Sequence, residues 1–380
     1  FKMSQQQLNE KEILLPITSP NHKMIPRETR ILGLTRKQLS LIILVIQNST
    51  LVLMMRYSRI RQKPGENMYM ASTAVYLAEV VKIIACLGVL LYQKKSFGRF
   101  CYVVQKEILG QPHETLKMFI PSALYALQNN LLYVALSNLE AATFQVTYQM
   151  KILSTAVFSV VLLERKLTYF KWFALILLMI GVTLVQLQTV SPVKPSTKVL
   201  NTDNLEEEST VAATAAAQLL LAQNPLIGLF AVITSCVSSG FAGCYFEKIL
   251  KKTDTSMWIR NIQLGITGAL FSLIGMIFYD SYAILNGGFL QGYDSLTYAV
   301  IANQALGGLL VAIVVKYADS ILKGFATSLS IIISGIISFY WFDFHPTIQF
   351  IIGAIIVIIS TYLYGRPDRT PKTLSKVSDS

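Results

Sequence analysis

Ten apolar stretches constrain the fold of this chain more than any other feature of its sequence. Each is about 17–23 residues long, enough for a helix to cross the ~30 Å hydrocarbon layer of a bilayer. We expect the spans near residues 38–56, 71–92, 117–137, 140–162, 168–188, 225–246, 258–279, 297–316, 321–342 and 347–365. The sequence therefore predicts an all-α polytopic membrane protein with ten transmembrane helices.

Composition excludes several other classes of protein. Hydrophobic residues make up 53% of the chain and charged residues only 14%, a balance too apolar for a soluble enzyme, a disulfide scaffold or a disordered chain. Lys and Arg outnumber Asp and Glu by 33 to 21, but no basic stripe lies outside the membrane flanks, so we expect a lipid bilayer and no nucleic acid as partner. The four cysteines lack CxxC spacing, which predicts neither a disulfide framework nor a zinc site.

Charge placement predicts the orientation. An even number of spans puts both termini on one side, and most Lys and Arg residues lie in the tails and in the loops of that side. By the positive-inside rule, both termini are expected in the cytoplasm. The predicted organisation is a cytoplasmic N-terminal tail (1–37), a first five-helix repeat (38–188), a lumenal linker (189–224), a second five-helix repeat (225–365) and a cytoplasmic C-terminal tail (366–380).

The linker divides the chain into two halves of five spans each. An odd number of spans per half forces the second half to enter the bilayer upside down. Residues 128–132 resemble residues 306–310, and residues 140–142 resemble residues 319–321 at nearly the same offset. These observations predict two inverted five-helix repeats, an architecture typical of transporters.

Two lysines are placed where a membrane makes them unfavourable. Lys151 lies in the middle of the fourth span, where an ammonium group costs roughly 3 kcal/mol. Helical spacing puts Phe144, Tyr148, Lys151 and Thr155 on one face, and the same offset places Lys323 on the matching face of the ninth span. Two lysines without acidic neighbours favour a cationic site for phosphate oxygens between the repeats. Snorkelling is the alternative for Lys323, which is near a span end.

Polar residues of the second and third spans extend this picture. Glu79 and Lys82 are spaced to form an internal ion pair, which would become a switch if a ligand competed for the lysine. Tyr125, Gln128 and Asn129 share one face of the third span. Carboxamides match the donors and acceptors of a nucleobase, and a phenol ring can stack on it. Hydrogen bonding between helices is the alternative interpretation.

The sixth and seventh spans add small and polar positions. Ser239 precedes Gly240 and Gly243, two glycines three residues apart that allow another helix or a ligand to approach the backbone closely. Asn261 is deep enough in its span to face a cavity. The histidines and aspartates lie in tails, in loops or at span ends, so we expect no catalytic residue, no metal site and no cofactor.

Five segments, residues 127–131, 135–153, 239–250, 258–263 and 316–331, resemble the nucleotide-sugar transporters, in particular the branch that carries UDP-galactose, UDP-N-acetylglucosamine and CMP-sialic acid. The similarity runs from about residue 40 to 366. It implies a ten-helix drug/metabolite-transporter fold in the Golgi membrane, where a cytosolic nucleotide sugar is exchanged for a nucleoside monophosphate. Glycosyltransferases of the lumen release that monophosphate.

Matched motif by motif, the resemblance also implies roles for single residues. Tyr125, Gln128 and Asn129 would hold the base, and Lys151 and Lys323 the phosphates. The remaining positions would line the cavity (Tyr148), contact the nucleotide (Ser239, Gly240, Gly243, Asn261) or pair near the sugar (Glu79, Lys82).

Departures from the CMP-sialic acid type narrow the substrate. Phe144 and Gly265 stand where that type has tyrosine, which favours UDP-galactose exchanged for UMP, with UDP-N-acetylglucosamine or UDP-N-acetylgalactosamine as candidate further substrates. A UDP-N-acetylglucosamine transporter and, less closely, a CMP-sialic acid transporter remain alternatives. The sequence also leaves open a homodimer and an association with lumenal glycosyltransferases.

Two other classes compete with this interpretation. A membrane glycosyltransferase using a UDP-sugar would need an acidic metal motif near a membrane face. An exporter of cationic drugs would need buried carboxylates in place of buried lysines.

Overall fold

The computed structural model describes residues 33–60, 69–187, 224–253, 255–342 and 345–366, and within these ranges the regular elements are helices. The predicted linker and both predicted tails lie almost entirely outside the described residues. The elements are α2 (Arg36–Ile60), α3 (Ala71–Lys94), α4 (Phe97–Val104), the π-helical turn η1 (Gln105–Leu109), α5 (Pro112–Asn138), α6 (Ala141–Tyr148), α7 (Met150–Leu163), α8 (Tyr169–Leu187), α10 (Pro225–Lys252), α11 (Met257–Tyr279), α12 (Ser281–Gly287), α13 (Ser295–Tyr317), α14 (Ser320–Trp341) and α15 (Ile348–Gly365).

Nine spans among the described residues are long and apolar enough to cross a membrane, counting α6 and α7 as one. In each of them, between 17% and 44% of the most apolar window is buried inside the protein. More than half of each window is therefore exposed or only partly buried, which is typical of helices surrounded by lipid. For the described residues, the prediction of an all-α chain with many helices suited to span a membrane is confirmed, with nine such helices where ten were predicted.

The third predicted span, residues 117–137, lies in α5, which is not among these nine helices. With 27 residues α5 is long enough to cross a bilayer, but Ser122, Gln128, Asn129 and Asn130 interrupt its apolar sequence. The helix nevertheless packs between neighbours, most extensively against α10 and then α11. Ser122 and Gln128 are buried in the protein, whereas Asn129 and Asn130 are exposed, and together these four residues make the helix less apolar than the nine spans.

The fourth predicted span is broken in the middle. Gln149 separates α6 from α7, and its backbone N–H donates to the Val146 carbonyl at 3.2 Å in a tight turn. The Gln149 side chain is buried and donates to the Gln186 amide oxygen of α8 at 2.5 Å. The break falls two residues before Lys151, which therefore lies in the first turn of α7 rather than inside a continuous helix.

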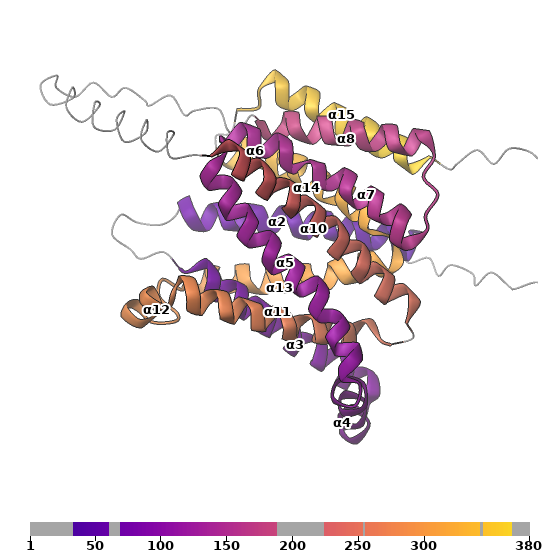
Figure 1. Ribbon diagram of the computed structural model, residues 1–380, viewed down its shortest axis with the longest axis vertical. Coiled ribbons are helices and arrows are strands. Elements are labelled where there is room, and N and C mark those ends of the chain that lie inside the picture. Colours follow the sequence, from indigo (N-terminus) through magenta and orange to yellow (C-terminus); the bar gives the residue numbers. More distant parts are fainter. Residues whose placement is uncertain (1–32, 61–68, 188–223, 254, 343–344, 367–380) are drawn as a thin grey trace, which may run out of the picture.

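Helix packing follows a regular scheme (Figure 1). We call α2–α8 the first half and α10–α15 the second half. The packing of α5 on α10 has its counterpart in α13 on α2, and that of α7 on α10 in α14 on α2. The pair α5 and α11 likewise matches α13 and α3, while α3–α11 and α8–α15 join equivalent positions of the two halves. If each helix of the first half is exchanged for the helix at the same position of the second half, the same pairs of positions remain in contact.

The pair α8–α15 forms one edge of the bundle (Figure 1, top). Its helices come close because glycines face each other: a Cβ at Gly353 would lie 2.8 Å from the Gly181 carbonyl oxygen. A larger residue at either position would push the backbones apart.

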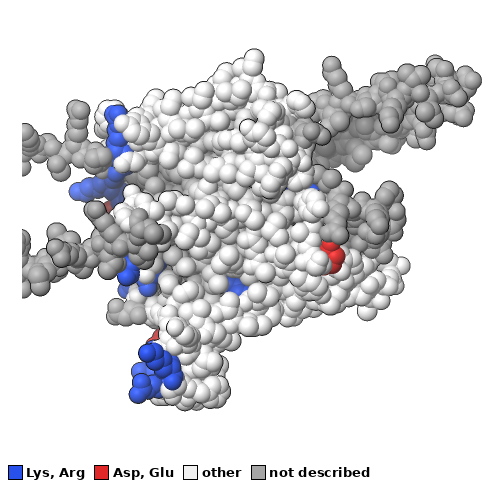
Figure 2. Space-filling model, turned by 180° about the vertical axis from the view of Figure 1, so that it is seen from behind, with Lys and Arg blue, Asp and Glu red and all other residues white. Residues whose placement is uncertain are grey.

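The two ends of the bundle differ in charge. We call the end where α2 begins and α15 ends the terminal face, and the end where α8 ends and α10 begins the linker face. Figure 2 shows Lys and Arg gathered at the terminal face, with one cluster at the lower tip near α4. This asymmetry is the one from which the sequence predicted the orientation.

Candidate functional site

The first half contributes a chain of polar contacts around Lys151. The ammonium nitrogen lies 4.0 Å from the centre of the Tyr148 ring, and that ring stacks on Phe144 with centroids 5.5 Å apart. Gln128 of α5 donates its amide N–H to the Tyr148 hydroxyl at 3.5 Å. The expected shared face of Phe144, Tyr148 and Lys151 is therefore present despite the break at Gln149.

The second half contributes Lys323, which lines a cavity of about 150 Å³ between α2, α13 and α14. The other lining residues include Gln47 and Asn48 of α2, Gln304 of α13 and Thr327 of α14. Lys323 therefore borders an internal space. The helices that carry the two lysines, α7 and α14, pack against each other.

No ion pair neutralises either lysine in the part of the chain that the structure describes. The nearby acid Glu247 is buried and already paired: Arg165 donates to it at 2.6 Å, Lys251 at 2.7 Å and the Ser320 backbone N–H at 2.8 Å. Two ammonium groups thus share one region of the protein without a carboxylate of their own. An anion is the ligand that such a region attracts.

Glu79 and Lys82 form the predicted ion pair on α3, with the lysine 8% and the glutamate 24% exposed. Glycines of the second half make room for it. A Cβ at Gly268 of α11 would lie 3.0 Å from the Glu79 carboxylate, and one at Gly308 of α13 would lie 3.0 Å from Lys82 Cδ. The pair therefore sits in the packing between the halves, and the two glycines were not predicted as part of a site.

The α10 positions separate into two kinds. A Cβ at Gly240 would lie 2.8 Å from the Ser154 carbonyl carbon and 2.8 Å from the Thr155 nitrogen, so this glycine brings α10 against the α7 backbone. At Gly243 a Cβ would meet only the Tyr125 hydroxyl, at 3.9 Å, and the Ser320 hydroxyl, at 4.0 Å. The structure thus places Gly243 beside Tyr125.

Three predicted site residues make no hydrogen bond to the lysines of the candidate site. Ser239 is half-buried, and Asn129 is exposed. Asn261 is buried, and its side-chain amide donates back to the Met257 carbonyl of the same helix at 3.0 Å. The structure links none of the three to the lysines by a hydrogen bond.

Two polar residues of α2 were missed from the sequence. The Gln47 amide donates to the Asn303 carbonyl at 3.0 Å, and the Asn48 amide donates to the Ser330 hydroxyl at 2.7 Å. Both also line the cavity at Lys323. Two carboxamides inside an apolar span were the available signal, since a membrane disfavours unpaired polar groups.

Ion pairs at the terminal face were also missed. Arg165, in the connection between α7 and α8, binds Glu247 of α10 and Asp319 at the start of α14, the latter at 2.7 Å. Arg260 of α11 binds Glu114 of α5 at 2.6 Å. Hydrogen bonds from Lys117 and then Arg260 hold the pKa of the Glu114 carboxyl below its usual range. These contacts join the two halves at that face.

Comparisons with known proteins agree on one family. A family model described as nucleotide-sugar transporter matches residues 33–365. A UDP-N-acetylglucosamine transporter of Mus musculus is 53% identical over 331 residues, covering 87% of this chain and 95% of the relative. The Homo sapiens protein of the same name is 52% identical over 332 residues, with the same coverage. A UDP-galactose translocator of Canis lupus familiaris is 46% identical over 345 residues, covering 90% of this chain and 80% of the relative.

One solved structure shares the fold at low sequence identity. A crystal structure with 10% identity aligns with a TM-score of 0.59 over 87% of this chain and 96% of the other. At that identity the match concerns the helix arrangement alone.

Proposed function

The chain belongs to the nucleotide-sugar transporter family, and we propose that it carries a UDP-sugar across the Golgi membrane in exchange for UMP. Its relatives are transporters and translocators, so the chain is a transporter and not an enzyme, which removes the membrane glycosyltransferase from consideration.

The observation that carries the proposal is the pair of lysines without acidic partners. Lys151 on α7 and Lys323 on α14 occupy helices that pack equivalently in the two halves. A diphosphate between them would neutralise both ammonium groups and form charge-assisted hydrogen bonds, while Tyr148 and Gln128 offer an aromatic face and a carboxamide to a base. The family supplies the substrate class, and these residues supply a place for its phosphates.

For the sugar, we propose UDP-N-acetylglucosamine as the first substrate to test and UDP-galactose as the second. The residue pattern favoured UDP-galactose, but proteins named UDP-N-acetylglucosamine transporters are more similar to this chain, at 53%, than UDP-galactose translocators, at 46%. The two sugars differ in the direction of one hydroxyl and in an N-acetyl group. We use this difference in sequence identity only to choose which sugar is tested first.

The mechanism we propose is alternating access between two inverted repeats. The helix contacts that survive exchange of the halves support a two-fold relation between them. When the site is empty, repulsion between Lys151 and Lys323 opposes closure of the halves on each other. Either the UDP-sugar or UMP relieves that repulsion, so the protein returns loaded in both directions, which favours exchange over one-way leak.

Transport into proteoliposomes tests the proposal. Vesicles preloaded with UMP are offered radiolabelled UDP-N-acetylglucosamine, UDP-galactose, UDP-N-acetylgalactosamine and CMP-sialic acid. We expect uptake of UDP-N-acetylglucosamine, of UDP-galactose or of both, stimulated by internal UMP. Lys151→Gln and Lys323→Gln should each weaken substrate binding about 10- to 100-fold, because a hydrogen bond to a charged group contributes ~1.5–3 kcal/mol.

Lys166→Gln is the matched control, since Lys166 is an exposed lysine on the connection between α7 and α8. It should transport like the unchanged protein. Normal UMP exchange by both site variants would show that the lysines do not hold the phosphates. Uptake that ignores internal UMP would contradict the exchange.

A further inference from the structure

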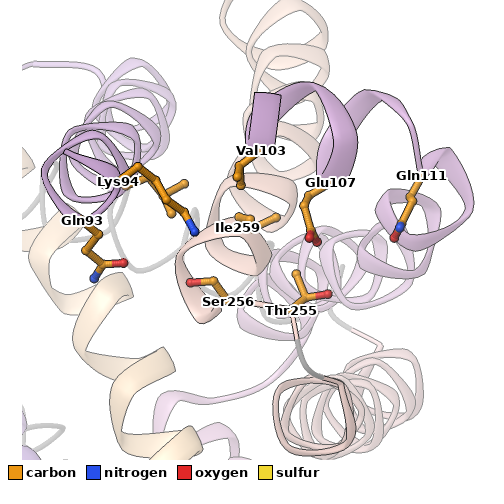
Figure 3. A pocket seen from close by; sticks show the side chains of 9 residues that line it. Gln93, Lys94, Val103, Glu107, Gln111, Thr255, Ser256 and Ile259 are labelled. Carbon is orange, nitrogen blue, oxygen red and sulfur yellow. The ribbon is translucent and has the colours of Figure 1, made fainter. Parts of the chain in front are cut away.

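A second, larger cavity opens at the terminal face. It measures about 380 Å³ and is lined by the end of α3, by α4 and η1, and by the start of α11 with the residues before it. Its nine lining residues are Leu90, Gln93, Lys94, Val103, Glu107, Gln111, Thr255, Ser256 and Ile259 (Figure 3). The cavity shares no residue with the one at Lys323, and the proposed transport mechanism makes no use of it.

Two opposite charges face this cavity without pairing. Lys94 points into it from α3 and Glu107 from η1, on opposite sides of Ile259 (Figure 3). Both residues are half-buried. Neither forms an ion pair with the other or with any other described residue. Charges that share a cavity but stay apart leave room for a ligand that carries both signs.

The walls of the cavity are fixed by hydrogen bonds. Gln263 donates to the Glu107 carbonyl at 3.2 Å, which ties η1 to α11. Thr255 accepts from Arg260 at 3.4 Å, and Ser256 accepts from the Trp258 backbone N–H at 3.4 Å. The hydroxyl protons of Thr255 and Ser256 remain available to a ligand oxygen. The site is therefore preformed, and its volume is typical of small-molecule sites, which measure ~300–1,000 Å³.

The surroundings of the cavity suit the boundary between lipid and water. Phe97 and Tyr102 on α4 are 71% and 62% exposed, and Leu109 at the end of η1 is 73% exposed. Lys95 and Arg99 are exposed beside them in the sequence, and Figure 2 shows a basic cluster at the lower tip of the molecule. Exposed aromatic residues next to basic residues are typical of segments that lie at the level of lipid headgroups.

From these observations we propose that the cavity binds the headgroup of phosphatidylethanolamine, with its phosphate at Lys94 and its ammonium group at Glu107. A purely anionic headgroup would be repelled by the Glu107 carboxylate, and a cation would be repelled by the Lys94 ammonium group. The choline headgroup also carries both charges, but its quaternary ammonium has no N–H to donate to Glu107. Ethanolamine satisfies both residues and is anchored in the membrane beside the cavity.

Thermal unfolding of the purified full-length chain in detergent provides the test. Phosphatidylethanolamine, phosphatidylcholine and phosphatidylglycerol are titrated separately, because a ligand of the folded state raises the unfolding temperature. We expect phosphatidylethanolamine to stabilise most. Lys94→Gln and Glu107→Gln should each lower its apparent affinity at least fivefold. Glu107→Gln should also reverse the preference toward phosphatidylglycerol, a change that a loss of packing would not produce.

Lys95→Gln is the matched control, because Lys95 is the neighbouring exposed lysine and does not line the cavity. It should respond to lipid like the unchanged protein. The ranking of lipids on the unchanged protein is itself a test, independent of how well the variants fold.

Four outcomes would overturn the proposal. Stronger stabilisation of the unchanged protein by phosphatidylglycerol would indicate general attraction of anions, as would an equal loss in Lys95→Gln. Equal stabilisation by soluble phosphoethanolamine would identify a solute site rather than a lipid site. Loss of stabilisation by UMP in Lys94→Gln, with the response to lipid retained, would make the cavity an entrance for the transported nucleotide.

Discussion

Single buried glutamines show how the structure distinguishes a binding residue from a packing residue. Gln263 of α11 uses its whole carboxamide: its oxygen accepts from Arg260 at 3.0 Å, and its amide donates to Glu107 and Thr115. Gln128 of α5 is also buried, but its side-chain oxygen has no hydrogen-bond partner. Buried acceptors are normally satisfied, so an orphaned one beside Tyr148 is suited to a ligand donor.

Replacing each glutamine by leucine should therefore have opposite effects. Gln128→Leu removes an unsatisfied group, which leaves thermal stability unchanged or slightly higher, but it should weaken UDP-sugar binding about tenfold, the loss of one hydrogen bond of ~0.5–1.5 kcal/mol. Gln263→Leu should lower the unfolding temperature, because it leaves Arg260 and the Glu107 carbonyl with fewer partners. Calorimetric titration and thermal unfolding measure the two effects.

If Gln128→Leu lost stability while keeping its affinity for the nucleotide sugar, the residue would be a packing residue, and the base would have to be recognised elsewhere.

For single residues, the sequence predicted which charged side chains matter better than it predicted which atoms each residue contacts. The membrane cost of an ammonium group singled out Lys151 and Lys323 without knowledge of their neighbours. The same reasoning placed Glu79 and Lys82 in one ion pair, which the structure confirms. It could not separate Gly240 from Gly243, because that difference depends on which atoms of α7 and α5 lie opposite, and no local pattern encodes them.

Among the elements, α10 packs against helices of both halves, α5 and α7 of the first and α13 of the second. Its Gly240 touches the backbone of α7, the helix that begins with the Lys151 segment. About two helical turns further on, the C-terminal end of α10 is held by Glu247, which is buried and receives Arg165 and Lys251. Breaking a buried ion pair costs about 3–5 kcal/mol, so this end is the more firmly fixed one.

Gly240→Ala and Gly243→Ala form a matched pair on this helix. Alanine at Gly240 would overlap the α7 backbone, and we expect it to lower stability by about 1–3 kcal/mol, as overpacking does. Alanine at Gly243 has ordinary contacts and, being the better helix former, should keep or raise stability. Thermal unfolding in detergent measures both variants.

Uptake assays on the same pair then locate the ligand. A folded Gly243→Ala protein with reduced UMP exchange would support Gly243 as a contact of the nucleotide, as the family resemblance implied. Equal stability of the two variants would show that the backbones of α7 and α10 are too far apart for an alanine at position 240 to overlap α7.

For the whole molecule, the pattern of hydrophobic spans predicted the class of fold, while packing determined its exceptions. Apolar length is a local property, so nine spans could be predicted directly. The polar α5 and the break at Gln149 depend on partners elsewhere in the chain, α10 and α11 for the first and Gln186 of α8 for the second. The cavity at Lys94 could not be predicted either, because its walls come from both halves.

Orientation in the membrane follows from the whole distribution of charge. Lys and Arg gather at the terminal face (Figure 2), which the positive-inside rule assigns to the cytoplasm. Cysteine placement offers a direct way to test this. Cys101 on α4 is exposed, whereas Cys86, Cys236 and Cys244 are buried.

In sealed membrane vesicles whose cytoplasmic side faces outward, a membrane-impermeant maleimide should label Cys101 without permeabilisation. A Cys101→Ser protein should remain unlabelled, because the other three thiols are shielded by packing. Adding Ser137→Cys to that protein places an exposed thiol near the linker-face end of α5, and it should react only after the vesicles are opened. The reverse pattern would put the terminal face in the lumen, so that the cavity at Lys94 and the ion pairs of Arg165 and Arg260 would face the lumenal leaflet. Exchange of UDP-sugar for UMP would then begin from the opposite end of the bundle.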